Sequence, residues 1–348
     1  MTHSELAAAL AGYIAAQTGA PHVQVEEFSR LSGGAIQDNY ALTLVLEGGY
    51  QPGRQQYVVR CDAPSGVSAS LSRPEEFAVL KKAFEADVTV PEPFWLCDNK
   101  SVIGQSFYVM SRAMGTASPQ KLVGGDLTDA QRSELTRQFG RELGHLHRIK
   151  PPVSGLDFLP QPTESAAQAR IDLYRDYLAA IAEPHPVLEW ALNWLEDNQP
   201  ANGPSVLCHC DFRTGNYMVD QGRLTAVLDW EFATWSDPAE DLGWLCSRSW
   251  RFGADEREVG GIGHKAELFA GYQEVTGEQP DPDRVNYWEV MALVRWAVIA
   301  LQQAERHLSG EQSSLELALT GRMLPQMEYD LLQQVRELSD PEKRGTKS

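Results

Sequence analysis

The spacing of apolar residues changes once along the chain, and this change limits the folds open to it. From about residue 24 to 60, short β-rich runs such as YALTLVLEG and QQYVVRCD alternate with turn residues, a pattern typical of antiparallel strands. From about residue 128 onward the pattern is mostly helical, and in residues 131–149 the apolar side chains are three or four positions apart. The order predicts an α+β fold in which a small sheet precedes a larger set of helices.

The length of 348 residues exceeds what a single hydrophobic core usually reaches, so two lobes are expected. We expect an N-terminal lobe at 1–110, built from an antiparallel sheet and one helix that starts near Pro74. A larger, mostly helical lobe should follow at 111–338. The polar residues at 339–348 predict a disordered tail.

Charge and hydropathy exclude some partners. The chain has 30 basic against 48 acidic residues, a net charge of −18, which disfavours binding to nucleic acid or to an anionic membrane. No apolar run approaches the length of a membrane span, and the N-terminus reads as an amphipathic helix without a basic signal region. These features predict a cytoplasmic protein.

The stretch CHCDFRTGN at 208–216 allows two kinds of chemistry, and one is a metal site. Cys208 and Cys210 flank His209, but on an extended segment the thiols and the imidazole point to opposite sides. A structural zinc site also needs a second ligand pair at similar spacing, which the sequence lacks. We therefore interpret Cys208 as a small buried residue and expect the five cysteines to be reduced thiols.

The other kind of chemistry is phosphoryl transfer. This reaction needs a carboxylate beside the acceptor hydroxyl and oxygen ligands for magnesium. Asp211 and Asn216 lie on one loop, and Asp229 follows a hairpin that turns at residues 220–222. The spacing supplies two hard oxygen ligands for Mg²⁺, Asn216 and Asp229, and leaves Asp211 to act on the hydroxyl. Each residue alone also fits an ordinary turn or cap, and only their order favours the kinase interpretation.

With these motifs the chain resembles the aminoglycoside phosphotransferase and choline kinase family, whose fold is protein-kinase-like and two-lobed. The resemblance is carried by the pattern HxDxxxxN at 209–216, by LDWE at 228–231 and by DPAEDLG at 237–243. In the small lobe it extends to LSGGAIQDNYAL and FYVMSRAMG, so that it covers about residues 28 to 330. It implies an antiparallel-sheet N-lobe and a larger helical C-lobe.

The resemblance also implies roles in the large lobe. Asp211 would be the catalytic base, and Asn216 and Asp229 would hold Mg²⁺. His209 and Asp241 would support the catalytic loop.

In the small lobe the resemblance implies contacts with ATP. Arg60, paired with Glu76, would clamp its phosphates, and the connector around Tyr108 to Ser111 would offer backbone groups to adenine. The residues expected at the nucleotide are Ser32, Gly33, Gly34, Ala35, Arg60, Glu76, Tyr108 and Met110.

Three residues depart from the family pattern. Cys210 stands where most members have glycine, which adds a side chain inside a tight loop. Arg60 stands where many have lysine, and its bulkier fork is not equivalent. Arg213 stands where many have histidine, and a cation there could neutralise charge on the transferring phosphoryl group.

The resemblance therefore implies an enzyme that uses ATP and Mg²⁺ to phosphorylate a hydroxyl of a small molecule, either aminoglycoside-like or another metabolite. A hydroxyacyl-CoA kinase and a nucleotide-binding pseudokinase without turnover are the alternatives. A protein kinase is disfavoured, because Asp229-Trp230-Glu231 lacks the Phe-Gly switch and no Ala-Pro-Glu segment follows.

Overall fold

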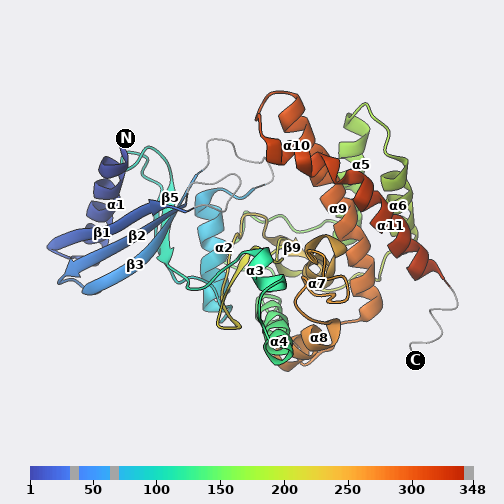
Figure 1. Cartoon of the computed structure of the whole chain (residues 1–348), viewed down its shortest axis with the longest axis horizontal. Coiled ribbons are helices and arrows are strands. Elements are labelled where there is room, and N and C mark those ends of the chain that lie inside the picture. The colour runs from blue at the N-terminus through green and yellow to red at the C-terminus, as the bar shows by residue number, and fades with distance from the viewer. Residues whose placement is uncertain (32–38, 63–69, 341–348) are drawn as a thin grey trace.

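The structure is a computed structural model that describes residues 1–31, 39–62 and 70–340. Figure 1 shows two lobes, with the sheet at the N-terminal end and the helices at the C-terminal end. The predicted order of strands and helices is confirmed, and the fold is α+β.

The N-terminal lobe is an antiparallel sheet whose described strands follow the order β1-β2-β3-β5-β4. Their bounds are β1 His22–Arg30, β2 Asn39–Glu47, β3 Gly53–Cys61, β4 Pro93–Cys97 and β5 Phe107–Ser111. The lobe holds one helix more than the one expected in it near Pro74: the amphipathic helix expected at the N-terminus also packs on this sheet, so that a helix covers each face. Helix α1, His3–Thr18, packs Leu10 and Ile14 onto one face, and α2, Arg73–Glu85, covers the other.

The side chains of β5 alternate between the two faces of the sheet, and each face packs against one of these helices. Phe107 and Val109 face the core shared with α1, whereas Tyr108 and Met110 face α2 and the large lobe. Glu75 completes a capping box at the start of α2, next to the predicted Pro74. The face that carries Tyr108 is therefore the one turned toward the rest of the molecule.

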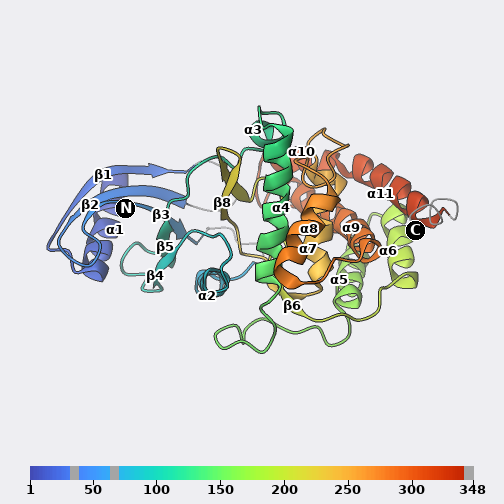
Figure 2. The same ribbon diagram turned by 90° about the horizontal axis from the view of Figure 1, so that it is seen from below.

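The C-terminal lobe is mostly helical (Figure 2). Its helices are α3 Pro119–Val123, α4 Asp129–Leu146, α5 Ala166–Ala180, α6 Pro186–Asp197, α7 Pro238–Cys246, α8 Lys265–Thr276, α9 Pro282–Leu308, α10 Leu315–Arg322 and α11 Leu324–Ser339, with a short 3₁₀ turn at Arg248–Trp250. Its short strands are β6 Val206–Cys208, which pairs with β9 Thr234–Ser236, and β7 Tyr217–Asp220, which pairs with β8 Arg223–Val227.

Two features of this lobe position its loops. Helices α4 and α8 pack closely through glycine, since a Cβ on Gly140 would lie 2.0 Å from the carbonyl oxygen of Leu268. The β7–β8 hairpin turns through Gln221 and Gly222, both with positive φ (49° and 79°), as a two-residue turn between twisted strands requires.

The chain crosses between the lobes beside this hairpin. After β5 ends at Ser111, Thr116 pairs with Val219 of β7, and Met114 accepts a hydrogen bond from Thr225 Oγ1 at 2.6 Å. Residues 112–116 are thereby held along the hairpin. Of the tail expected at 339–348, residues 341–348 lie outside the described part of the chain, and α11 reaches Ser339. Among the described helices none combines the length and hydropathy needed to cross a membrane.

Candidate active site

The loop at residues 209–216 is fixed from below by a buried carboxylate. Asp241, in α7, accepts backbone N–H groups of His209 and Cys210, both at 2.7 Å, one on each oxygen. His147 Nε2 lies 3.2 Å from the same carboxylate. Burial alone would raise the pKa of Asp241, but the hydrogen bonds and the neighbouring His147 and His209 outweigh it and hold the pKa below its usual value. Asp241 therefore serves as a charged anchor of the loop.

Cys210 occupies a left-handed backbone position, with φ of 59°. This conformation explains why a glycine suits the position, since L-residues other than glycine pay about 1–2 kcal/mol for it. The Cys210 side chain is buried with Val206 and Cys208, and its sulfur lies 3.6 Å from Arg170 Nη2. The extra side chain is thus accommodated behind the loop.

His209 joins the loop to the segment that carries Asp229. Its Nδ1 accepts the backbone N–H of Asp211 at 3.1 Å, and its Nε2 donates to the carbonyl oxygen of Leu228 at 2.9 Å. Both ring nitrogens are used, so the imidazole acts as a strut between the two chain segments and has no nitrogen left for a metal ion.

The carboxylate of Asp211 receives three side-chain donors. Trp244 Nε1 and Arg213 Nε lie 3.0 and 3.1 Å from Oδ1, and Asn216 Nδ2 donates to Oδ2. Trp244 belongs to α7 and lies 33 residues along the chain from Asp211. The sequence favours a large-lobe core position for this tryptophan, with the lining of the acceptor pocket as the alternative, and no motif spacing marks its N–H as a partner of Asp211.

Asn216 is oriented so that its oxygen is available for another ligand. Its Nδ2 donates to both the carbonyl oxygen and the carboxylate of Asp211, and since both partners are acceptors, the amide oxygen must face the other way. Asp229 supplies a second oxygen at the end of the hairpin, with φ of 67°. An amide oxygen and a carboxylate are ligands that suit Mg²⁺, so these two residues fit the ion.

A buried arginine links Asp229 to the small lobe. Arg60, at the end of β3, forms an ion pair with Asp229 and another with Glu76 of α2, where Nη2 lies 2.8 Å from Oε1. Burial would raise the pKa of Asp229, but the Arg60 guanidinium outweighs this and holds it below the usual range. The structure thus brings Arg60, Glu76 and Asp229 together between the lobes.

Of the other residues expected at the nucleotide, the structure describes only some. Ser32, Gly33, Gly34 and Ala35 lie outside the described residues. Tyr108 and Met110 lie inside β5, whose backbone is paired with β3 on one side and β4 on the other. Their backbones run within this sheet, and the described residues that follow beyond the strand pairs are 112–115.

The zinc alternative gains no support from the cysteine pair. In the part of the chain that the structure describes, His147, Cys208 and Asp241 form a buried group with ligand atoms within 4.8 Å of one another. Each has another partner: Tyr272 for His147, the Asp237 carbonyl for Cys208 and the loop amides for Asp241. The group is a hydrogen-bonded support beneath the catalytic loop.

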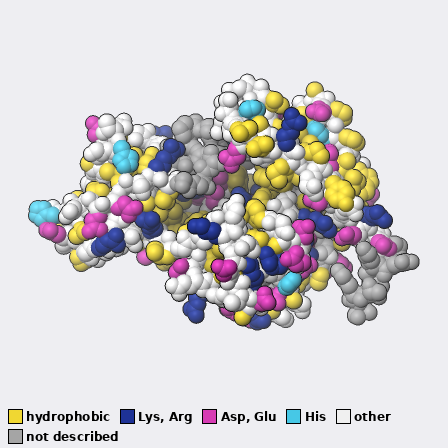
Figure 3. Space-filling view, viewed as in Figure 1, with side chains coloured by type: hydrophobic (Ala, Val, Ile, Leu, Met, Phe, Trp, Pro, Cys, Tyr) yellow, Lys and Arg dark blue, Asp and Glu magenta, His cyan; other side chains and the backbone are white. Residues whose placement is uncertain are grey.

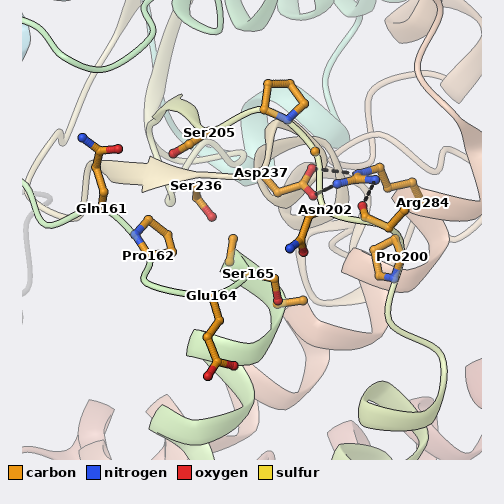
Figure 4. A pocket seen from close by; sticks show the side chains of 15 residues that line it. Gln161, Pro162, Glu164, Ser165, Pro200, Asn202, Ser205, Ser236, Asp237 and Arg284 are labelled. Carbon is orange, nitrogen blue, oxygen red and sulfur yellow. Dashed lines mark hydrogen bonds and ion pairs between the residues drawn. The ribbon is translucent and has the colours of Figure 1, made fainter.

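Figure 3 shows acidic, basic and hydrophobic side chains mixed over the face that it draws. A separate cavity lies in the large lobe, lined by residues 161–167 and 200–205 with Asp237 and Arg284. Figure 4 shows that these two side chains face each other, and Arg284 Nε lies 2.9 Å from Asp237 Oδ2. Asp237 also caps α7 through the N–H of Ala239. Its charge is satisfied, and none of the predicted site residues lines this cavity.

The two-lobed fold, with Asp211, Asn216 and Asp229 gathered at the junction, defines the chain as a protein-kinase-like enzyme of the small-molecule kinase class. The sequence profile described as "Phosphotransferase enzyme family" matches residues 27–277. The chain belongs to this family.

Solved structures share the fold. A crystal structure from Ralstonia eutropha assigned to the aminoglycoside phosphotransferases has a TM-score of 0.74 at 24% identity, covering 95% of this chain and 98% of that one. The ternary complex of aminoglycoside phosphotransferase APH(4)-Ia with ADP and hygromycin B has a TM-score of 0.60 at 15% identity, covering 95% and 99%. These likenesses confirm the predicted protein-kinase-like fold.

Among curated proteins, the chain is similar to acyl-CoA dehydrogenase family member 11 of Rattus norvegicus, 28% identical over 282 residues. This match covers 78% of the chain and 36% of the rat protein. The chain therefore spans about a third of the length of that relative. Hygromycin-B 4-O-kinase of Escherichia coli is 34% identical over 83 residues, which is 18% of this chain and 23% of that enzyme.

Proposed function

We propose that this protein transfers the γ-phosphoryl group of ATP to a hydroxyl group of a small molecule, with Mg²⁺. One observation carries the proposal: hydrogen bonds at Leu228 tie the loop of Asp211 and Asn216 to the segment of Asp229, and Asp229 pairs with Arg60 at the junction of the lobes. A carboxylate, two oxygen ligands and a phosphate-binding cation are the groups that this transfer needs.

In the proposed reaction the acceptor oxygen forms a bond to the γ-phosphorus, and the bond from that phosphorus to the β–γ bridging oxygen breaks, releasing ADP. The hydroxyl proton passes to the Asp211 carboxylate, which Trp244 and Arg213 hold in place. Arg60 and Arg213 offset negative charge on the phosphates. Bound Mg²⁺, held by Asn216 and Asp229, would neutralise further charge on the nucleotide.

The position proposed for adenine is the connector at residues 112–115. Ala113 lies just beyond the strand pairs and outside the bridge at Thr116, and no described residue hydrogen-bonds to its backbone groups, which would leave them to meet the base edge. ADP and AMP-PNP in the APH(4)-Ia complexes support a nucleotide in this fold.

The test is ATP consumption by the purified protein across aminoglycosides, amino alcohols, sugars and hydroxyacyl-CoAs, with Mg²⁺ and with EDTA. Acceptor-dependent consumption that EDTA abolishes is the expected result. Tight Mg²⁺-dependent nucleotide binding with no consumption for any acceptor would contradict turnover and favour a pseudokinase.

A further inference from the structure

Three arginines surround the catalytic loop on the side of the large lobe. Arg213 follows Asp211 on the loop itself, Arg170 lies on α5 and Arg295 on α9. We call these three residues the arginine wall. The described residues that pair with it are two carboxylates, Asp211 and Glu240.

The charges of this wall do not balance. Glu240 is shared by two guanidinium groups, at 2.9 Å from Arg170 and 3.8 Å from Arg295. The second distance is too long for a hydrogen bond, and the buried Nη1 of Arg295 has no hydrogen-bond partner among the described residues. This buried donor of Arg295 is unpaired by the described residues, so the guanidinium keeps hydrogen-bonding capacity that the wall itself does not use.

The cations are also more exposed than the anions. The side chains of Arg170, Arg213 and Arg295 are 21%, 27% and 14% exposed, whereas those of Glu240 and Asp211 are 5% and 10% exposed. The carboxylates are therefore more shielded from solvent than the guanidinium groups. A molecule that approaches Asp211 from this side meets positive charge, although the whole chain carries −18.

Two of these guanidinium groups lie over tryptophan rings. Arg213 lies 4.6 Å from the ring centre of Trp250, and Arg295 lies 4.4 Å from that of Trp244. Trp250 in turn packs on Trp244 and on the half-buried Trp296, with ring centres 5.0 and 4.8 Å apart. A guanidinium stacked on an indole loses little freedom when it binds an oxyanion, which favours a forked contact.

Trp244 connects this wall to the reacting atoms. Its N–H donates to Asp211, and its ring face contacts Arg295. An acceptor whose hydroxyl lies at Asp211 is therefore separated from Arg295 by about the Trp244 ring.

We infer that the acceptor is a hydroxy compound that carries an oxyanion, either a carboxylate or a phosphate, and that Arg295 and Arg170 bind this group. The inference rests on the proposed function and specifies the class of its substrate. A polycationic acceptor, such as an aminoglycoside, would meet three cations at this wall and is disfavoured.

The test compares four acceptors that share a three-carbon diol skeleton: 1,2-propanediol, 3-amino-1,2-propanediol, glycerate and glycerol 3-phosphate. A larger pair, a hydroxyacyl-CoA and kanamycin, extends the comparison. Binding to the protein loaded with MgADP is measured by tryptophan fluorescence and calorimetry, and ATP consumption is measured in parallel. The anions should bind at least about tenfold more tightly than their matched neutral and cationic compounds. Preference between glycerate and glycerol 3-phosphate distinguishes a carboxylate from a phosphate.

The Arg295→Gln variant should weaken binding of the preferred anion about tenfold and leave the affinity for MgADP unchanged. Arg141→Gln, which removes a cation from a surface ion pair with Glu134, is the matched control and should change neither. Equal binding across the panel, preference for the cations, or an unchanged anion affinity in Arg295→Gln would overturn the inference. Anion binding without ATP consumption would sustain it and count against the proposed phosphotransferase function alone.

Discussion

At the scale of single residues, the sequence predicted that Asp211, Asn216 and Asp229 lie near one another, because their spacing along one loop and one hairpin reflects local geometry. The sequence could not pair Asp211 with Trp244, since that contact depends on how α7 packs under the loop. A buried tryptophan is usually a core residue, and the hydrophobic pattern of a helix does not show which group its indole N–H will contact.

We predict that Trp244→Phe lowers kcat about tenfold and leaves the Michaelis constant for ATP unchanged. The variant keeps an aromatic ring but loses the hydrogen bond to Asp211, and a tenfold change corresponds to about 1.4 kcal/mol. Steady-state kinetics on the preferred acceptor measures both constants. Trp288→Phe is the control, since the buried N–H of Trp288 has no hydrogen-bond partner among the described residues. Equal losses in both variants would show that Trp244 acts only through packing.

Arg213 is the second residue whose effect on the chemical step can be measured separately from its effect on ATP binding. We predict that Arg213→Ala lowers the rate of the chemical step about 10²-fold and changes the Michaelis constant for ATP much less, because the cation acts on charge that develops during transfer. Arg213→Lys should recover part of the rate, since it keeps the charge but not the stacked fork over Trp250. Single-turnover kinetics measures the step, and an unchanged rate would discard the role.

At the scale of elements, the sequence predicted most of the sheet, α2, α4 and the hairpin at residues 220–222, because their periodicity and turn residues are local signals. The position of α1 on the sheet was not predicted, because the sequence of an amphipathic helix does not show which surface its apolar side covers. The division of β5 between two cores was likewise not predictable, because it depends on where both helices pack.

The element that fixes the catalytic loop is α7, through Asp241. We predict that Asp241→Asn destabilises the protein by about 3–5 kcal/mol, since the amide keeps one acceptor oxygen and leaves the other loop N–H buried and unpaired against its NH₂ group. Thermal unfolding measures this. Asp176→Asn, on an exposed position of α5, is the control and should leave Tm nearly unchanged. A Tm within 1–2 °C of the wild type in Asp241→Asn would contradict the anchoring role.

The Asp241 carboxylate should also account for part of the loss of protein stability in acid. The pKa of Asp241 is lower in the folded protein than in the unfolded chain, so its stabilisation is present above the ordinary carboxyl pKa of about 3.9 and is lost as the pH falls through the folded value. Tm measured from pH 6 to pH 3 should therefore fall less steeply in Asp241→Asn than in the wild type.

At the scale of the whole molecule, the two lobes and their order were predictable from the single change in hydrophobic pattern. The contact between them was not, because the ion pair from Arg60 to Asp229 joins residues 169 positions apart. The positions of Asn216 and Asp229 suggest that a metal and nucleotide strengthen this junction.

We predict that Mg²⁺ with AMP-PNP raises Tm, by an amount equivalent to about 2.7 kcal/mol when the ligand is at 100 times its Kd. EDTA should remove most of this increase. Asp229→Asn should lose the Mg²⁺-dependent part, whereas Asp220→Asn, at the exposed hairpin turn, should keep it. A Mg²⁺-dependent increase that persists in Asp229→Asn would place the metal elsewhere.

The role of Asp211 in phosphoryl transfer is tested by the rate of ³²P transfer from [γ-³²P]ATP to the preferred acceptor in the wild type and in Asp211→Asn, with the affinity for MgADP measured on both. We predict a loss of at least about 10³-fold in the rate with an MgADP affinity within about twofold of the wild type, because the amide cannot take the hydroxyl proton. Transfer by Asp211→Asn within tenfold of the wild-type rate would contradict the proposed mechanism.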